Sequence, residues 1–421
     1  MITNKIKRQL DAIDWDFPVS QLGTTKLPHW YPGTFPPQLP ATLIQALTQI
    51  DDLVFDPYGG AGTTASEAIR LGRKAWIVDI NPIGILGNYS YCALLLIRSI
   101  SLDKLNLFFK YIDDFISKNS STLDFSEIDA EILDFDKFAS KYMQPTPENL
   151  LSKIRLQREP NWEGLKRWID PLTITELGNL RQNINDSITS TFLKLFFDTM
   201  ISANLRALCS QNKSWGHIAD NVYPKSFIYK NVTVQLRKWL KILHTNLIEV
   251  SFETHLQPKG ICYWAEIHDW CSIDRLINSP PVEANIIITS PPYGDAIDYI
   301  YSQKLSMYFL GYDDEKITNL CKQEIGARRK RSKTESRNDW AIQLTKAAIN
   351  QSKLIINGGY YVSILPHKNH GREIGIKMMT EGLIENGWGQ VFEMDRSINQ
   401  KKTRQSWTSI KQETINIFLR Q

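Results

Sequence analysis

The stretch that decides the fold is DDLVFDPYGGAGTTASEAIRLGRKAWIVDINP, residues 51–82. It begins with a short apolar run at residues 53–55, passes through a glycine-rich turn, and then shows the periodicity of a helix. A second apolar run at residues 75–78 ends in Asp79. Two strands separated by one helix form a β-α-β unit, whose strands must be parallel. The stretch therefore predicts a parallel sheet with helices packed on it.

A second region rich in strands follows residue 260. It contains GICYWAEIHDW (260–270), an apolar strand at residues 285–289, LIINGGYYVSIL (354–365) and QETINIFLR (412–420). Gly358 and Gly359 are expected in a turn that precedes a strand. Together the two regions predict one doubly wound α/β sheet.

The chain between these regions, from about residue 91 to 255, has helical periodicity with many Leu, Ile, Phe and Lys. Examples are TSTFLKLFFDTMISANLRALC (189–209) and TVQLRKWLKILHTNLIEV (233–250). A structureless loop of that length would be implausible. We predict a sheet domain made from residues 1–90 and 256–421, interrupted by an α-rich inserted domain at 91–255. A flexible stretch is expected near residues 143–153.

Composition narrows the class of protein. The 421 residues carry a formal net charge of +4, from 49 Lys and Arg against 45 Asp and Glu, so any contact with nucleic acid must be regional. The five cysteines show no CxxC pair and no histidine has a partner at metal spacing, so we expect no disulfides and no metal site. The most apolar run, YCALLLIRSI from Tyr91, is shorter than the roughly twenty residues of a membrane span. The sequence predicts a soluble protein of a reducing cytosol, with no membrane segment.

The turn from Asp56 to Thr64 follows the first strand, at the edge where doubly wound sheets bind ligands. Its glycines let a ligand approach the backbone, and the helix start offers N–H groups. Asp79 ends the next strand, at the spacing of an acid that accepts hydrogen bonds from a ribose diol. Together they favour a ligand that contains adenosine. A plain strand-helix turn, with Asp79 capping the segment that follows, is the alternative.

The strand at residues 285–289 runs into Ser290-Pro291-Pro292-Tyr293. The prolines fix a rigid corner that offers a hydroxyl, a carbonyl outside the strand ladder, and an aromatic ring. Such a corner can accept hydrogen bonds from an exocyclic amino group at Ser290 Oγ and the Pro291 carbonyl, while Tyr293 stacks on a planar base. A strand ended by two prolines beside a core tyrosine is the alternative.

Three segments, FDPYGGAGTT, VDINP and TSPPYGDAIDY, resemble the amino-group DNA methyltransferases that depend on S-adenosylmethionine. The Ser-Pro-Pro-Tyr form is most typical of the members that methylate cytosine N4. The resemblance covers residues 29–90 and 260–421. It implies a seven-stranded Rossmann-like methyltransferase sheet, with the insert in the position of a target-recognition domain.

The resemblance also assigns roles to residues. The glycine turn would hold the methionine part of the cofactor, Asp79 the ribose and Asp269 the adenine amino group, with the upstream segment HWYPGTFPPQLPATLI (29–44) against the cofactor. The expected cofactor-binding residues are Thr34, Phe35, Pro36, Asp56, Pro57, Tyr58, Gly60, Gly62, Thr63, Thr64, Asp79, Ile80 and Asp269. The expected catalytic residues are Ser290, Pro291, Pro292 and Tyr293. They would accept the amino protons and free the nitrogen lone pair, with no covalent enzyme intermediate.

Two basic runs, ARRKRSK (327–333) and KKTRQSW (401–407), are expected to contact the phosphates of double-stranded DNA. Their residues are Arg328, Arg329, Lys330, Arg331, Lys401 and Arg404. A solvated charged face is the alternative for both. In the insert, residues 204–225 form either a base-reading surface or a connection between helices.

The predicted function is methylation of cytosine N4, in a base flipped out of the DNA duplex, by a cytoplasmic bacterial enzyme. A restriction endonuclease that acts on the same site is an expected partner. Three alternatives stay open: adenine N6 methylation, guanine N2 methylation of RNA, and a non-catalytic module that binds nucleic acid.

Overall fold

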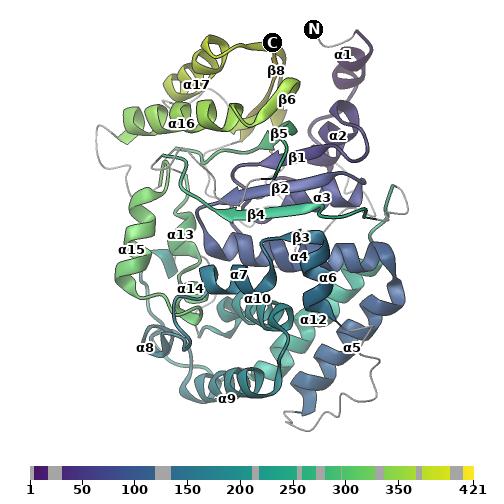
Figure 1. Ribbon diagram of the computed structural model, residues 1–421. Coiled ribbons are helices and arrows are strands. Elements are labelled where there is room, and N and C mark those ends of the chain that lie inside the picture. The colour runs from purple at the N-terminus through teal and green to yellow at the C-terminus, as the bar shows by residue number, and fades with distance from the viewer. Residues whose placement is uncertain are drawn as a thin grey trace.

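A single eight-stranded sheet runs through the molecule, with helices on both faces and a large helical lobe below it in Figure 1. This computed structural model describes residues 4–17, 31–118, 134–210, 218–253, 258–271, 280–294, 296–327, 336–366, 372–398 and 411–421. The strands are β1 (Leu53–Asp56), β2 (Lys74–Asp79), β3 (Met143–Gln144), β4 (Tyr263–Ile267), β5 (Ala284–Thr289), β6 (Ile355–Pro366), β7 (Trp388–Ser397) and β8 (Gln412–Arg420). The helices are α1 (Asn4–Asp11), α2 (Gln38–Leu47), α3 (Thr63–Arg70), α4 (Pro82–Ile100), α5 (Leu102–Lys118), α6 (Phe135–Tyr142), α7 (Pro147–Ile154), α8 (Trp162–Lys166), α9 (Pro171–Ser187), α10 (Thr191–Leu208), α12 (Val232–Ile248), α13 (Tyr299–Ser302), α14 (Lys304–Phe309), α15 (Asp314–Gln323), α16 (Ser336–Ser352) and α17 (Glu373–Glu385).

The strand order across the sheet is β3-β4-β2-β1-β5-β6-β8-β7. β1 pairs in parallel with both β2 and β5, so the carboxyl ends of these strands lie at one edge. β8 is antiparallel to its neighbours β6 and β7. The predicted doubly wound α/β fold is confirmed. The sheet has one strand more than the seven expected, because β3 from the insert pairs with the otherwise open edge of β4.

Two local details differ from the expectations. Residues 143–153, where a flexible stretch is expected, form β3 and then helix α7, which Thr146 caps by accepting the Asn149 N–H at 3.5 Å, with Pro147 in the first helical turn. Gly358 and Gly359 lie inside β6 rather than before it, where the pairing with β5 shifts register. A Cβ on Gly359 would lie 2.7 Å from the Asn285 carbonyl oxygen, so this bulge requires glycine.

The sheet is covered on both faces because side chains alternate along each strand. Val54 of β1 packs into the cluster that contains α3 and α4, whereas Leu53 and Phe55 pack into the cluster that contains α16 and α17. The β1 side chains are all buried, as expected for a central parallel strand. The apolar run that predicted this strand is therefore explained by burial on two sides.

Helix α4 joins the sheet to the helical lobe. It contacts β2 and β4 as well as α5 and α10. By length and composition alone this helix could cross a membrane, but 83% of its apolar window is buried inside the fold, which is the environment of a core helix. No other helix in the described ranges passes that test.

The helical lobe also receives residues that follow the Ser-Pro-Pro-Tyr corner. Helix α14 contacts α10 and α8, and α13 and α15 lie beside it at the left of the lobe in Figure 1. The chain thus passes from the Ser-Pro-Pro-Tyr corner into the lobe and back to the sheet at α16. This route places residues from the lobe at the carboxyl edge of the sheet.

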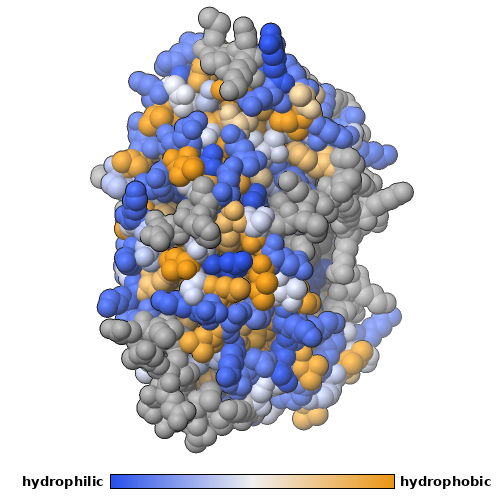
Figure 2. Space-filling view, turned by 90° about the vertical axis from the view of Figure 1, so that its right-hand side faces the viewer, coloured by the Kyte–Doolittle hydropathy of each residue, from blue (hydrophilic) through white to orange (hydrophobic). Residues whose placement is uncertain are grey.

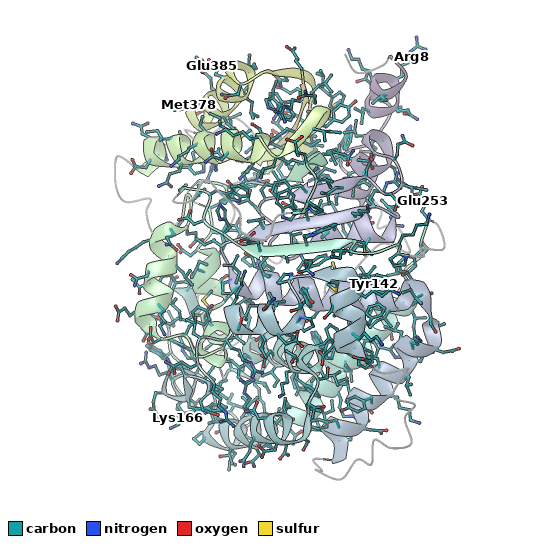
Figure 3. All side chains as sticks on the ribbon, viewed as in Figure 1. Arg8, Tyr142, Lys166, Glu253, Met378 and Glu385 are labelled. Carbon is teal, nitrogen blue, oxygen red and sulfur yellow. The ribbon has the colours of Figure 1, made fainter. Side chains whose placement is uncertain are left out.

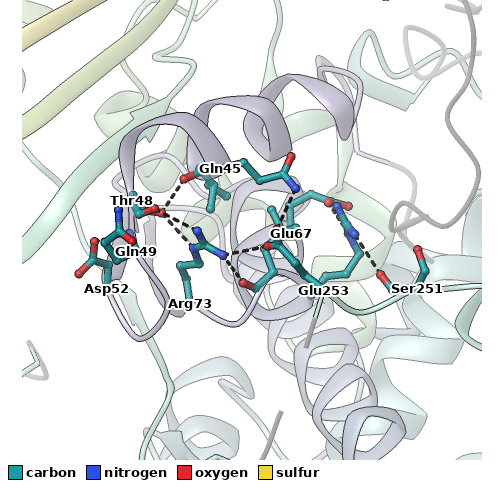
Figure 4. Close-up of polar contacts among 11 residues, drawn as sticks. Gln45, Thr48, Gln49, Asp52, Glu67, Arg73, Ser251 and Glu253 are labelled. Carbon is teal, nitrogen blue, oxygen red and sulfur yellow. Dashed lines mark hydrogen bonds and ion pairs between the residues drawn. The ribbon is translucent and has the colours of Figure 1, made fainter. Parts of the chain in front are cut away.

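The chain returns from the insert to the sheet through a network of polar contacts (Figure 4). Arg73 donates from Nε to Thr48 Oγ1 at 3.1 Å and from Nη1 to Glu253 Oε2 at 3.0 Å. Arg70 donates to the Ser251 carbonyl at 3.0 Å. Glu253 lies at the right-hand edge in Figure 3, where β1 and β2 begin. These bonds therefore fix the end of the insert at the edge opposite the carboxyl ends of the parallel strands.

The face on the right of Figure 1 is turned towards the viewer in Figure 2. Its described hydrophobic residues form small groups separated by hydrophilic ones. Such scattered groups are normal for a protein surface. This face therefore gives no indication of a broad apolar interface.

Candidate active site

A cavity of about 830 Å³, open solvent at its mouth included, lies at the carboxyl edge of the sheet. Its walls come from the ends of β1, β2, β4 and β5, from the N-terminal segment 31–35, and from residues 323–325 at the end of α15 and just beyond it. The expected site residues that line it are Thr34, Phe35, Asp56, Tyr58, Gly60, Thr63, Asp79, Ile80, Asp269, Ser290 and Pro292. The structure thus brings the glycine turn and the Ser-Pro-Pro-Tyr corner to one shared space.

Other expected site residues lie behind the cavity wall. Pro57 accepts the Trp270 Nε1–H at its carbonyl at 2.8 Å, and Thr64 Oγ1 donates to the Ile288 carbonyl at 3.4 Å. Gly62 begins α3 in a left-handed conformation. Pro36, Pro291 and Tyr293 are also absent from the lining. The expected DNA-contacting residues Arg328, Arg329, Lys330, Arg331, Lys401 and Arg404 lie outside the described residues.

The glycine turn is fixed to the acid at the end of β2. The Gly60 N–H donates to Asp79 Oδ2 at 2.7 Å, and the Gly59 N–H donates to the Val78 carbonyl at 2.9 Å. Gly60 has a φ of +47°, a conformation that favours glycine. From the other side, a Cβ on Gly84 of α4 would lie 2.8 Å from the Gly60 carbonyl oxygen. The turn is therefore held between a carboxylate and a closely packed helix.

Asp79 is not the N-cap of helix α4, although it accepts a hydrogen bond from the segment that leads into this helix. Asn81 takes that role by accepting the Ile83 N–H at 3.0 Å, while Asp79 Oδ1 accepts the Asn81 N–H at 2.8 Å. Burial raises the pKa of Asp79 to about 6, although these backbone donors lower it. Each carboxylate oxygen has two lone pairs, so Asp79 can still accept hydrogen bonds from a ligand in the cavity.

Asp56 joins the ends of β1 and β5. Its Oδ1 accepts the Thr289 hydroxyl at 2.7 Å and the Tyr58 N–H at 3.1 Å. Burial raises the pKa of Asp56 to about 6 as well. The carboxylate is therefore both a bridge between two strands and part of the cavity wall.

The cavity is strongly acidic. Among its described lining residues four are carboxylic acids, Asp56, Asp79, Asp269 and Glu324, and none is lysine or arginine. A site lined by charges of one sign attracts a ligand of the opposite sign. No three His, Cys, Asp or Glu residues come together as metal ligands within the described ranges. The charge therefore favours an organic cation as the ligand.

The Ser-Pro-Pro-Tyr corner is braced from behind. Ser290 Oγ donates to Tyr293 Oη at 3.1 Å, and Tyr293 Oη donates to Glu413 Oε1 at 2.8 Å. The Trp340 Nε1–H donates to the Pro292 carbonyl at 3.0 Å, and a Cβ on Gly294 would lie 2.8 Å from the Trp340 ring. Ser290 thus faces the cavity from a corner with little freedom to move.

Several lining residues were not predicted from the sequence. Tyr31 and Tyr299 stack with ring centroids 6.0 Å apart at one side of the cavity, and Glu324 accepts the Tyr299 N–H at 2.5 Å. Tyr31 lies within the quoted segment 29–44, so that segment contained a signal for it. Tyr299 is the last residue of the segment TSPPYGDAIDY, so that segment contained a signal for it. Glu324 follows α15, carries no local motif and reaches the site only through tertiary packing.

The strand order, the glycine turn after the first strand and the cavity at the carboxyl edge define a Rossmann-like methyltransferase fold. Residues 5–95 match a family described as DNA methylase. The chain is also 22% identical over 417 residues to the Type II methyltransferase M.MjaII of Methanocaldococcus jannaschii, covering 86% of this chain and 77% of that protein. It is 22% identical over 311 residues to the Type II methyltransferase M.MvaI of Kocuria varians, covering 71% of this chain and 61% of that protein. These findings confirm the predicted relationship to amino-group DNA methyltransferases.

Proposed function

We propose that this protein is a site-specific DNA methyltransferase that transfers a methyl group from S-adenosylmethionine to N4 of a flipped-out cytosine. The observation that carries the proposal is the shared cavity, which Ser290, Gly60 and Asp79 all line. These residues lie far apart in the sequence, and a donor and an acceptor base must meet in one space for direct transfer. Ser290, in place of an acidic or amide residue, favours cytosine over adenine on the family resemblance.

The cavity suits S-adenosylmethionine in charge. The four carboxylates suit a cationic ligand, and the Gly60 turn, Asp79 and Asp269 would hold its methionine, ribose and adenine parts. When bound, the cofactor supplies a methyl group on a positively charged sulfur.

The corner supplies hydrogen-bond acceptors for the target amine. An exocyclic amino nitrogen is a poor nucleophile because its lone pair is delocalised into the ring. Accepting its protons at Ser290 Oγ and the Pro291 carbonyl pulls the nitrogen towards sp³ and frees the lone pair. Direct attack needs no thiolate, and burial raises the pKa of Cys262 to about 12, which leaves that thiol unreactive at neutral pH.

The biological setting follows from the named relatives, which are Type II methyltransferases. We propose double-stranded DNA as the substrate, a restriction endonuclease of the same site as partner, and a cytoplasmic location. Within the chain, 91–255 would supply target recognition, 1–90 cofactor binding and 256–421 catalysis. Phosphate contacts from the two basic runs would offset part of the few kcal/mol needed to flip the base.

The test is transfer of labelled methyl from S-adenosylmethionine to DNA or RNA, followed by digestion to nucleosides and identification of the product by mass. N4-methylcytosine is the expected product, and Ser290→Ala is expected to lower kcat by about 100-fold or more, as loss of a key polar group does elsewhere. Ser99→Ala is the matched control, because Ser99 Oγ bonds to the Leu96 carbonyl on α4, away from the cavity.

Other products decide between the alternatives. N6-methyladenine alone would overturn the cytosine assignment, and methyl transfer to RNA alone would overturn DNA as the substrate. Retained DNA binding without transfer to either would favour a non-catalytic module. Full activity of Ser290→Ala would refute the role given to that hydroxyl.

A further inference from the structure

Behind the Ser-Pro-Pro-Tyr corner lies a buried carboxylate on another strand. Glu413 is the second residue of β8, only 8% exposed, and its Oε2 accepts Arg396 Nη1 of β7 at 2.6 Å. Its other oxygen, Oε1, accepts the Tyr293 hydroxyl at 2.8 Å. Glu413 does not line the cavity. It nevertheless lies two hydrogen bonds from Ser290 Oγ, which does.

The chemistry of the Glu413 carboxylate and the Tyr293 hydroxyl fixes the direction of both hydrogen bonds between Ser290 and Glu413. An ionised carboxylate only accepts, and a tyrosine hydroxyl has one proton to donate. Tyr293 is protonated, because burial and the nearby Glu413 raise its pKa well above the usual value. The Ile364 carbonyl is a second acceptor at 3.4 Å, but the shorter bond to the charged oxygen is the stronger one. Since Tyr293 donates to Glu413, it must accept from Ser290.

The consequence concerns the lone pairs of Ser290. Its hydroxyl proton is committed to Tyr293 at 3.1 Å, on the side away from the cavity. Both lone pairs of Oγ then remain as acceptors for a group in the cavity. An exocyclic amine presents N–H donors and needs such an acceptor. A serine whose proton pointed into the cavity would instead oppose an N–H with an O–H.

We propose that Glu413 is a positioning residue that acts through Tyr293 to keep the Ser290 oxygen an acceptor towards the target amine. This inference rests on the proposed function. Arg396 forms an ion pair with Glu413 and orients it, and Arg396 Nε in turn donates to the Trp15 carbonyl at 2.9 Å. The chain of contacts therefore runs from the N-terminal segment through β7 and β8 to the corner.

Glu413→Gln tests the donor-to-acceptor direction of these two hydrogen bonds without removing the side chain. Because Arg396 can only donate, the new amide must turn its oxygen towards Arg396 and its NH2 towards Tyr293. Tyr293 then accepts from residue 413 and no longer needs the Ser290 proton, and its own proton can point at Ser290 Oγ. We expect kcat to fall by about tenfold, the worth of one hydrogen bond, with KM for DNA and equilibrium DNA binding unchanged.

Two further measurements separate positioning from a structural role. Tyr293→Phe breaks the same link without touching the Arg396–Glu413 pair, so it should give a similar fall in kcat. In a Ser290→Ala background, Glu413→Gln should have no additional effect, because the group it orients is gone. Glu393→Gln makes the same substitution on β7 at a solvent-exposed position, and it should leave kcat and the melting temperature at the wild-type values.

The outcomes are distinguishable. A wild-type protein that transfers no methyl refutes the proposed function, and this inference with it, before any variant is made. Wild-type activity with normal kcat in both Glu413→Gln and Tyr293→Phe refutes the inference alone. Full additivity of Glu413→Gln with Ser290→Ala also refutes it. Should Glu413→Gln lower the melting temperature, the Tyr293→Phe result decides.

Discussion

Replacing Gly62 with alanine is expected to destabilise the fold strongly. Gly62 begins α3 with a φ of +84°, and a Cβ there would lie 2.2 Å from Asn88 Nδ2. Asn88 cannot move freely, because its Oδ1 accepts Cys92 Sγ at 3.2 Å and the Tyr263 hydroxyl at 3.4 Å. Both conformation and space therefore oppose the added methyl group.

The magnitude follows from these two effects. The left-handed conformation costs an L-residue roughly 1–2 kcal/mol. Overpacking a buried site costs about 1–3 kcal/mol more. We therefore expect the free energy of unfolding to fall by roughly 2–5 kcal/mol.

The matched control is Gly178→Ala. Gly178 lies inside α9, where a Cβ would meet nothing within 4 Å. Alanine favours a helix over glycine, so this change is expected to stabilise the protein by about 0.5–1 kcal/mol. The same substitution is thus expected to lower the free energy of unfolding at Gly62 and to raise it at Gly178.

Urea unfolding, followed by tryptophan fluorescence and far-UV circular dichroism, measures both variants. Their transition midpoints are compared with that of the wild type at equal slopes. A Gly62→Ala midpoint at or above the wild-type value, with Gly178→Ala shifted as expected, would refute the strained glycine turn.

Two other predictions concern the ligands. Burial raises the pKa of both Asp56 and Asp79 to about 6, so in the free protein each carboxyl is partly protonated near pH 6. A cationic ligand lowers these pKa values, so binding of S-adenosylmethionine should release protons at a pH of about 6 and none at about 8. Calorimetry in two buffers of different ionisation enthalpy measures the number of protons released. Equal release at both pH values would contradict this prediction. Replacing Arg328, Arg329 and Arg331 with glutamine should weaken DNA binding. The slope of log K for binding against log salt concentration should become less steep by about 0.9 for each phosphate that these side chains neutralise in the wild type. An unchanged slope would show that this run faces solvent.

The β-α-β unit was predictable because its signals are local. The apolar runs at residues 53–55 and 75–78 became β1 and β2, each with no more than one residue added at either end, since a buried parallel strand needs continuous apolar residues. The spacing between the glycine turn and Asp79 marked both as parts of one candidate ligand site. The hydrogen bond from Gly60 to Asp79 gives that spacing a physical reason.

The rest of the site depends on contacts between distant segments. Glu324 lies beyond the segment TSPPYGDAIDY, and nothing in its neighbourhood marks it as a cavity residue. Glu413 lies 120 residues beyond Tyr293 and reaches it only because β8 inserts antiparallel between β6 and β7. β3 has two residues and is defined by its partner, so no periodicity in its own sequence could reveal it.

The acidity of the cavity is itself an argument for a cationic ligand. Asp56 and Asp79 are almost fully buried, and a carboxyl pKa raised from 3.8 to about 6 means that ionisation costs the folded protein roughly 3 kcal/mol at each site. Because the pKa of each carboxyl is raised on folding, the folded state holds more protons than the unfolded state between pH 3.8 and about 6. The stability of the folded state therefore falls as the pH rises through this range, and the full cost applies above a pH of about 6. Backbone N–H groups and the Thr289 hydroxyl offset only part of that cost. A fold that served only stability would hold apolar residues at these strand ends, whereas carboxylates in a cavity wall can attract a cationic ligand.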